Sequence, residues 1–175
     1  MEILDRQNCP VCSQKTLTLK QDEMEIPHFG KVFVFSMTCS SCLYHQSDIE
    51  SLEEKEPIRC TLEISSEQDM KIKVIKSSFA TVKIPKLKMS VTPGPVSEGY
   101  ISNVEGVIDK FKDVIESERD TTEDENVKTA AKKLLKKIWK VKLGDIPVKL
   151  VIEDPSGNSA ILSDKVIVEK LKRKS

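Results

Sequence analysis

The stretch Thr38–Asp48 reads TCSSCLYHQSD and holds three side chains that commonly bind metal ions: Cys39, Cys42 and His45. A second pair with the same two-residue gap lies upstream, in the CPVC of Cys9–Cys12. Two residues between cysteines allow a tight turn to direct both sulfurs at one ion, and two such turns complete a tetrahedral zinc shell. The predicted ligands of one structural Zn2+ are therefore Cys9, Cys12, Cys39 and Cys42, with His45 outside the shell.

A redox dithiol is the alternative interpretation of each cysteine pair. A redox CxxC usually works alone at a helix N-terminus, whereas these pairs flank a predicted β-hairpin. Residues 17–26 and 31–39 alternate polar and apolar side chains, and PHFG at 27–30 is typical of a turn. The 26-residue spacer between the pairs exceeds the usual range of about 15–20, and a longer hairpin accommodates it. Four thiolates leave zinc no open position for substrate, which predicts a structural ion.

The composition indicates a globular chain without a membrane anchor. Its 175 residues are 38% hydrophobic and 32% charged, with a net charge of zero. No apolar run approaches the roughly 18 residues that a membrane span needs, and the N-terminus lacks the pattern of a secretory signal. We therefore expect a cytoplasmic protein with reduced cysteines. Cys60, which stands alone, is predicted to be a small buried strand residue.

Beyond the ribbon, which is expected to cover residues 1–50, the pattern predicts a second domain over residues 51–175 that is mostly β. Short alternating segments favour strands; they read CTLEI, MKIKVI, ATVKI, LKMSV, PVKLVIED, NSAILS and KVIVEKL. TPGP at 92–95 is expected to be a turn, and DPSGN at 154–158 a hairpin turn.

A helical hairpin is predicted at about 102–142, inserted between the two groups of strands. Ser102 with Glu105, and Thr122 with Glu125, match the capping-box pattern at the two helix starts. The polar ESERDT at 116–121 is expected to link the helices. Their apolar faces comprise Val104, Val107, Ile108, Phe111, Val114 and Ile115, then Val127, Ala131, Leu134, Leu135 and Ile138.

Gly106 is the unusual residue of this hairpin. Glycine in the first turns of a helix costs about 1 kcal/mol relative to alanine. We expect that close approach of another backbone explains it.

Charge and residue types narrow the function classes. Residues 1–50 carry seven acidic residues and four Lys or Arg, which disfavours a phosphate-gripping ribbon. Residues 105–125 hold nine acids, whereas residues 126–142 hold seven lysines and no acid. This pattern suits the helix dipole and also forms a candidate surface for an acidic partner. Both histidines lie in the ribbon, so residues 51–175 cannot build a Ser-His-Asp triad, and we predict no enzymatic activity.

Several stretches, in order along the chain, resemble one protein family: CPVC (Cys9–Cys12), IPHFGKVFVFSMTCSSCLY (Ile26–Tyr44), KIPKLKMSVTPGP (Lys83–Pro95), GYISNVEGVI (Gly99–Ile108) and EDPSGNS (Glu153–Ser159). They resemble the ZPR-type zinc-finger proteins. Four positions depart from the family pattern: Asp48 replaces the usual Glu, Leu43 the knuckle Gly, and Ser102-Asn103 a Thr-Thr pair.

The resemblance implies a zinc ribbon followed by a double-stranded β-helix, a jelly-roll-like sandwich that carries the helical hairpin. Eukaryotic members have two such modules in tandem, bind translation elongation factor one-alpha and assist its folding, and also bind a growth-factor receptor tail. This chain has one module and looks like the archaeal form. The partner expected from the resemblance is therefore an elongation factor of the one-alpha type, bound as by a chaperone; the oligomeric state stays open.

Two other functions remain to be weighed against this one. Zinc ribbons often bind nucleic acids, and KLKRKS at the C-terminus adds four positive charges. That interpretation describes a nucleic-acid-binding protein of the translation or transcription machinery, although the acidic ribbon makes nucleic acid an unlikely partner. The third interpretation is a redox or metal enzyme that uses a labile zinc or a dithiol. It requires a cysteine pair that reacts rapidly with thiol reagents in the metal-loaded protein.

Overall fold

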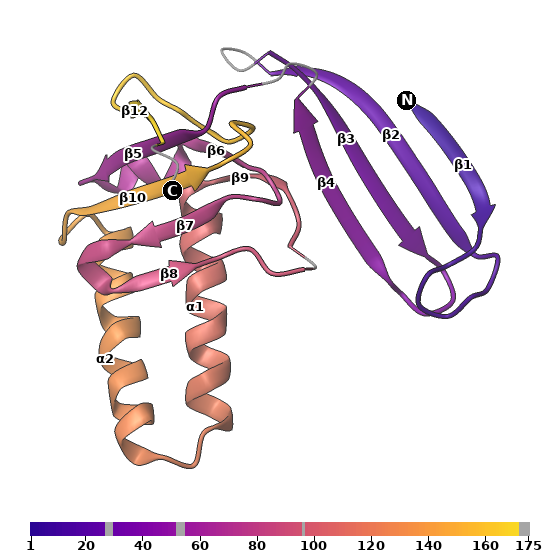
Figure 1. Ribbon diagram of the computed structural model, residues 1–175. Coiled ribbons are helices and arrows are strands. Elements are labelled where there is room, and N and C mark those ends of the chain that lie inside the picture. Colours follow the sequence, from indigo (N-terminus) through magenta and orange to yellow (C-terminus); the bar gives the residue numbers. More distant parts are fainter. Residues whose placement is uncertain (27–29, 52–54, 96, 172–175) are drawn as a thin grey trace.

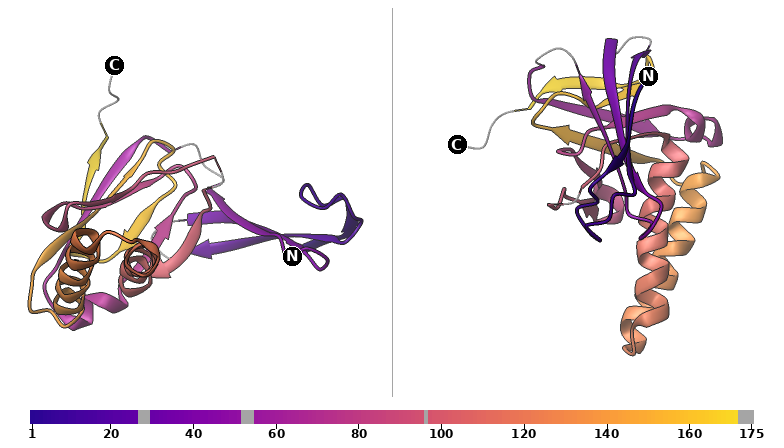
Figure 2. Two further views of the ribbon diagram at one scale, coloured as in Figure 1. Left: turned by 90° about the horizontal axis from the view of Figure 1, so that it is seen from below. Right: turned by 90° about the vertical axis from the view of Figure 1, so that its right-hand side faces the viewer.

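The computed structural model describes residues 1–26, 30–51, 55–95 and 97–171 (Figure 1). These residues form twelve strands and two α-helices. An N-terminal sheet projects from one side of a jelly-roll domain, and a helical hairpin extends from another part of that domain (Figures 1 and 2). This confirms the predicted fold class, a mostly β chain with a four-cysteine ribbon, a jelly roll and a helical insert. In the described part of the chain, neither helix has the length and apolar character that a membrane span requires.

The ribbon is an antiparallel sheet with the strand order β1-β2-β3-β4. Its strands are β1 (Glu2–Gln7), β2 (Leu17–Ile26), β3 (Gly30–Cys39) and β4 (His45–Ser51). The predicted hairpin is confirmed, because β2 pairs with β3 along its whole length. Residues 27–29 of the expected PHFG turn lie outside the described residues, and the predicted domain boundary after residue 50 stays a prediction.

Two sheets form the jelly roll. The five-stranded sheet has the order β12-β5-β10-β7-β8, and the three-stranded sheet has the order β11-β6-β9. Their strands are β5 (Ile58–Ile64), β6 (Lys73–Lys76), β7 (Thr81–Ile84), β8 (Met89–Val91), β9 (Tyr100–Asn103), β10 (Val148–Asp154), β11 (Ala160–Leu162) and β12 (Ile167–Lys170). Alternate side chains of β5 and β10 enter one core. Cys60 is among them and is buried as predicted, which raises the pKa of its thiol to about 11.

Two short 3-10 helices interrupt the strands: η1 (Glu67–Lys71) and η2 (Pro85–Leu87). The predicted strand MKIKVI therefore starts late, because its first residues belong to η1. Lys88 follows η2 with a φ of 55° and turns the chain, so that β7 pairs with β8.

The DPSGN segment is a turn but not the predicted hairpin. β10 pairs with β5 and β7, whereas β11 pairs with β6, so the segment carries the chain from one sheet to the other. The buried Asp154 carboxylate accepts hydrogen bonds from the hydroxyls of Ser77 at 2.8 Å, Ser159 at 2.6 Å and Ser156 at 2.7 Å. This network joins β6 to the crossing turn and satisfies a carboxylate that has no access to solvent.

The helices are α1 (Val104–Thr121) and α2 (Glu125–Lys142), and both predicted caps are wrong by one or two residues. The Asn103 side chain, and not Ser102, caps α1 by accepting a bond from Gly106 N at 2.8 Å. Asp124, and not Thr122, caps α2. The residues 116–121 that were expected to link the helices continue α1 instead. Several adjacent residues can serve as caps, and the extent of the paired helices selects among them.

The apolar faces of the hairpin are confirmed in most positions. The core takes up Val104, Val107, Ile108, Phe111, Ala131, Ile138 and Val141. Val114 is an exception because it is 67% exposed, beyond the end of the jelly roll. Lys142 lies 2.8 Å from Glu105 and 3.0 Å from Asp109 and so ties the end of α2 to the start of α1.

The explanation expected for Gly106 is wrong. A Cβ at this position would meet the hydroxyl of Ser102 and the side-chain oxygen of Asn103, 3.3 Å away, and no backbone of another element is among its nearest described atoms. The glycine therefore leaves room for the cap of its own helix.

Gly99 marks the contact between ribbon and jelly roll. A Cβ there would lie 2.6 Å from Asp48 Oδ1, 3.0 Å from Ile49 N and 3.2 Å from Lys76 O. Beside it, the buried Lys76 donates from Nζ to the carbonyls of Ser77 at 2.9 Å and Glu98 at 3.4 Å. Desolvation lowers the pKa of Lys76. Gly99 thus brings the segment before β9 close to the Asp48 carboxylate and to the backbone of β4.

We predict that Gly99→Ala lowers the free energy of unfolding by about 1–3 kcal/mol, because a methyl group meets backbone atoms on both sides. Gly94→Ala is the matched control, since a Cβ at Gly94 meets nothing within 4 Å. Urea unfolding of both variants in the zinc-loaded state measures the difference. Equal stability of the two variants would contradict the tight contact.

Candidate metal centre

Two matching turns position the four cysteines. Cys9–Cys12 lies between β1 and β2, and Cys39–Cys42 lies between β3 and β4. In the first turn, Ser13 N donates to Cys9 O at 2.9 Å and Cys9 N donates to Gln14 O at 2.9 Å. In the second turn, the same two bonds recur one for one, from Leu43 N to Cys39 O at 3.1 Å and from Cys39 N to Tyr44 O at 2.8 Å. The ribbon thus contains the same knuckle twice.

Each knuckle ends in a residue with left-handed backbone. Ser13 has a φ of 59° and Leu43 a φ of 60°. Both residues follow the second cysteine of their pair. The Leu43 side chain is 83% exposed, so no packing interaction accounts for a leucine in this strained position. Leu43 thus adopts the same left-handed backbone as Ser13 at the matching position of the first knuckle.

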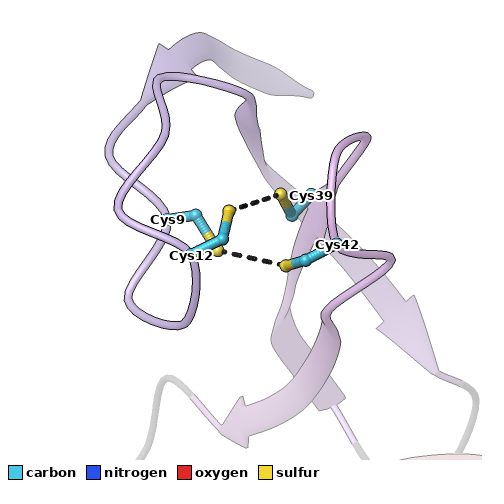
Figure 3. Close-up of side chains that lie close together, drawn as sticks. All are labelled: Cys9, Cys12, Cys39 and Cys42. Atoms are coloured by element: carbon cyan, nitrogen blue, oxygen red, sulfur yellow. Dashed lines mark hydrogen bonds between the residues drawn. The ribbon is translucent and has the colours of Figure 1, made fainter.

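The sulfurs converge to a set that fits one zinc ion. The four Sγ atoms all lie within 4.8 Å of one another, and Cys9 and Cys39 are buried (Figure 3). The Sγ atoms of Cys9 and Cys42 are 3.7 Å apart, as are those of Cys12 and Cys39. Zn–S bonds of about 2.3 Å in a tetrahedron place the sulfurs about 3.8 Å apart. The four cysteines are therefore able to bind one zinc ion.

The electrostatics of the cluster also favour a cation. The hydroxyl of Thr16, 3.2 Å from Cys39 Sγ, is the largest influence that lowers the pKa of Cys39, to about 6. The backbone of Tyr44 lowers the pKa of Cys42, but desolvation and the neighbouring sulfurs raise it more, to about 12. Four crowded sulfurs resist carrying four negative charges together, and a bound metal ion removes that conflict.

His45 lies outside the cluster, as expected. It begins β4 opposite Thr38, and its Nδ1 is 3.0 Å from the Thr38 hydroxyl. The group of potential ligands within reach of one ion contains the four cysteines alone among the described residues.

Thr16 and Leu17 are the residues of this site that the sequence pattern did not single out. Leu17 is buried against Cys9 and Cys39 at the start of β2. Both residues follow the first knuckle directly, so their position after CxxC is the one signal that the sequence offers.

We predict that the wild-type protein binds one zinc ion per chain and that Cys42→Ser does not retain it. His45→Asn should retain it, because His45 is not part of the cluster. Metal analysis after exhaustive dialysis measures the stoichiometry. Chelation should expose the ribbon amides to hydrogen exchange while β5 and β10 stay protected, since metal binding contributes on the order of 10 kcal/mol to such modules. Loss of zinc in His45→Asn would contradict this ligand set.

We predict that Leu43→Gly stabilises the zinc-loaded protein by about 1 kcal/mol, because glycine adopts a left-handed backbone without steric cost. Leu43→Ala keeps the Cβ and should show no such gain. Ser13→Gly should show a similar gain at the matching position. Chemical unfolding of the loaded proteins gives the comparison, and equal stability of Leu43→Gly and Leu43→Ala would refute the strain.

Comparison with known proteins places these two parts of the chain together in one family. Residues 2–57 match the ZPR1 zinc-finger domain, and residues 68–175 match the ZPR1 jelly-roll domain. A ZPR1-like protein of Methanocaldococcus jannaschii is 37% identical over 98% of this chain and 87% of its own length. A ZPR1-like protein of Pyrococcus horikoshii is 39% identical over 94% of this chain and 75% of its own length.

A more distant relative has a descriptive name. The zinc finger chaperone of Schizosaccharomyces pombe is 30% identical over 57% of this chain, which spans 22% of that protein. The two domain matches follow each other in the order of the four-cysteine ribbon and the jelly roll, and the two archaeal relatives share nearly the whole architecture. The chain therefore belongs to the ZPR1 zinc-finger family.

Proposed function

We propose that this chain is a cytoplasmic, non-enzymatic protein-binding module that engages a translation elongation factor of the one-alpha type and assists its folding. The observation that carries the proposal is the closed four-cysteine centre. Its four sulfurs fill a tetrahedral shell, which leaves a bound zinc ion no position for water or substrate. The metal then serves to hold the ribbon, and the surfaces of the protein perform the function.

The relatives support a chaperone role in general terms. The relative from Schizosaccharomyces pombe is named as a chaperone, and it shares 102 aligned residues with this chain. The choice of the elongation factor as the partner rests on the resemblance of the CPVC, CSSC, VEG and DPSGNS segments to those of the family. We extend this partner to a chain with a single module.

The distribution of polar groups also favours protein binding over catalysis. The most enclosed carboxylate, Asp154, is occupied by serine hydroxyls and is fully buried, so it offers nothing to a substrate. Apolar side chains that a partner could cover are instead exposed in several places, among them Phe79 in the loop between β6 and β7. Exposed aromatic residues of this kind are frequent anchors of protein interfaces.

We expect the zinc-loaded chain to bind purified elongation factor one-alpha of its source organism and to raise the yield of the factor on refolding from denaturant. Calorimetry and the recovered nucleotide binding of the factor measure the two effects. Cys42→Ser serves as the variant without a metal centre, and Leu43→Ala as a surface control on the same knuckle that keeps all four cysteines. If Leu43→Ala binds the factor and Cys42→Ser does not, the result supports a role for the ordered ribbon in binding.

The same preparation tests the competing nucleic-acid function. Binding of single- or double-stranded nucleic acid that weakens steeply with salt, with no effect on the elongation factor, would overturn the proposal. A zinc-loaded protein that neither binds the factor nor changes its refolding yield would overturn it as well.

A further inference from the structure

One face of the ribbon sheet carries an uncovered apolar groove. Pairing aligns Leu4, Leu19 and Met37 across three strands, and Phe35 follows Met37 on the same face of β3. Together with Glu2 and Asp48 these side chains line a depression of about 410 Å³. Leu4 is 53% exposed. The volume of this depression falls in the range of about 300–1,000 Å³ typical of binding pockets.

Acidic side chains surround this groove. Glu2 lies on the row of Phe35, and Glu23 and Glu25 continue the same face of β2. Lys31, opposite Glu25, lies 3.4 Å from Glu23 and neutralises part of that charge. The groove therefore suits a segment with an apolar centre and positively charged flanks.

The outer face of α2 has that complementary character. Trp139 is 64% exposed and Leu143, one helical turn later, is 47% exposed. Lysines flank them on the same side of the helix; they are Lys132, Lys136 and Lys140. Within the described residues, the lysines of α2 that form ion pairs are Lys128 and Lys142, and Lys132 interacts electrostatically with Glu125. Lys136 and Lys140 form no ion pair among the described residues and are the charges offered to a partner.

The two surfaces do not meet within one copy. The helical hairpin and the ribbon leave the jelly roll in different directions in Figure 1 and in the left view of Figure 2. The ribbon contacts the jelly roll closely at Gly99. The groove lies on the ribbon, whereas Trp139 lies near the base of the helical hairpin, one turn before the Lys142 bridges to α1.

We propose that two copies of this chain associate by exchange, with the Trp139 face of α2 in each copy docked in the acidic groove of the other copy's ribbon. Trp139 supplies the aromatic anchor, and Lys136 and Lys140 face the acidic rim. A reciprocal exchange uses all four surfaces of the pair, so the assembly closes as a two-fold dimer instead of growing into a filament.

Sedimentation equilibrium of the full-length, zinc-loaded protein tests the dimer. We expect dimers at about 0.1 M salt and weaker association at about 1 M salt, because the Debye length falls from about 10 Å to about 3 Å. Trp139→Ser should abolish the dimer under both conditions. A wild-type protein that is monomeric at low salt up to high protein concentration would overturn the proposal.

Charge reversal identifies the surfaces. Lys136→Glu with Lys140→Glu, or Glu2→Lys with Glu23→Lys, should each weaken association by at least ~10-fold. Mixing the two variants should restore association, since in the mixed dimer the reversed helix faces the reversed groove and the other contact pairs a wild-type helix with a wild-type groove. Lys71→Glu with Lys149→Glu makes the same change in net charge as the reversal of Lys136 and Lys140, on exposed sites elsewhere, and should leave the dimer intact.

Circular dichroism and zinc content verify that each variant is folded. A dimer that persists in both reversed variants would overturn the assignment of these surfaces, and so would a mixture that fails to associate. Binding of the elongation factor is measured separately, so a monomeric protein that still binds the factor refutes the exchange alone and leaves the proposed function intact.

Discussion

Four sulfurs held within 4.8 Å of one another are the constraint on which the ribbon depends. The direct hairpin joins only β2 and β3, whereas β1 and β4 are each connected through a knuckle that presents two cysteines. Around the cluster, Leu17 is the one buried apolar side chain besides the cysteines among the described residues. Farther along the described part of the sheet, Val32 and Ile49 are also buried. So few buried side chains offset little of the entropy of folding by hydrophobic burial. A zinc ion that clips both knuckles supplies this energy and leaves the faces of the sheet free for contacts with other molecules.

The spacing of the cysteines and the alternation of β2 and β3 could be predicted because both are local patterns. β1 and β4 could not, since EILDRQ and HQSDIES carry weak strand signals and are held by their neighbours in the sheet. The caps failed for a related reason. Asn103 lies beside Ser102, and Asp124 lies near Thr122, so that local chemistry permits either residue and the length of the packed helix decides.

Longer-range features had no signal in the sequence at all. DPSGN has the composition of a turn, but composition does not say whether the flanking strands share a sheet. The hydrogen bond between Ser77 and Asp154 spans 77 positions, and it commits this turn to crossing between the sheets. Leu43 differs from these features, because the sequence alone shows a residue that is unfavourable for the knuckle. The paired hydrogen bonds of the knuckle hold the backbone at a φ of 60° despite the leucine side chain.

The contact at Gly99 connects the metal centre to the rest of the molecule. β4, which follows the second knuckle, meets the segment before β9 through the Asp48 carboxylate and the backbone of Ile49. The acidic groove lies on the ribbon, which meets the jelly roll at Gly99, and the lysine face of α2 lies on the helical hairpin, whose two helices are joined by the Lys142 bridges. Two complementary surfaces that do not meet within a chain remain available for a contact between chains.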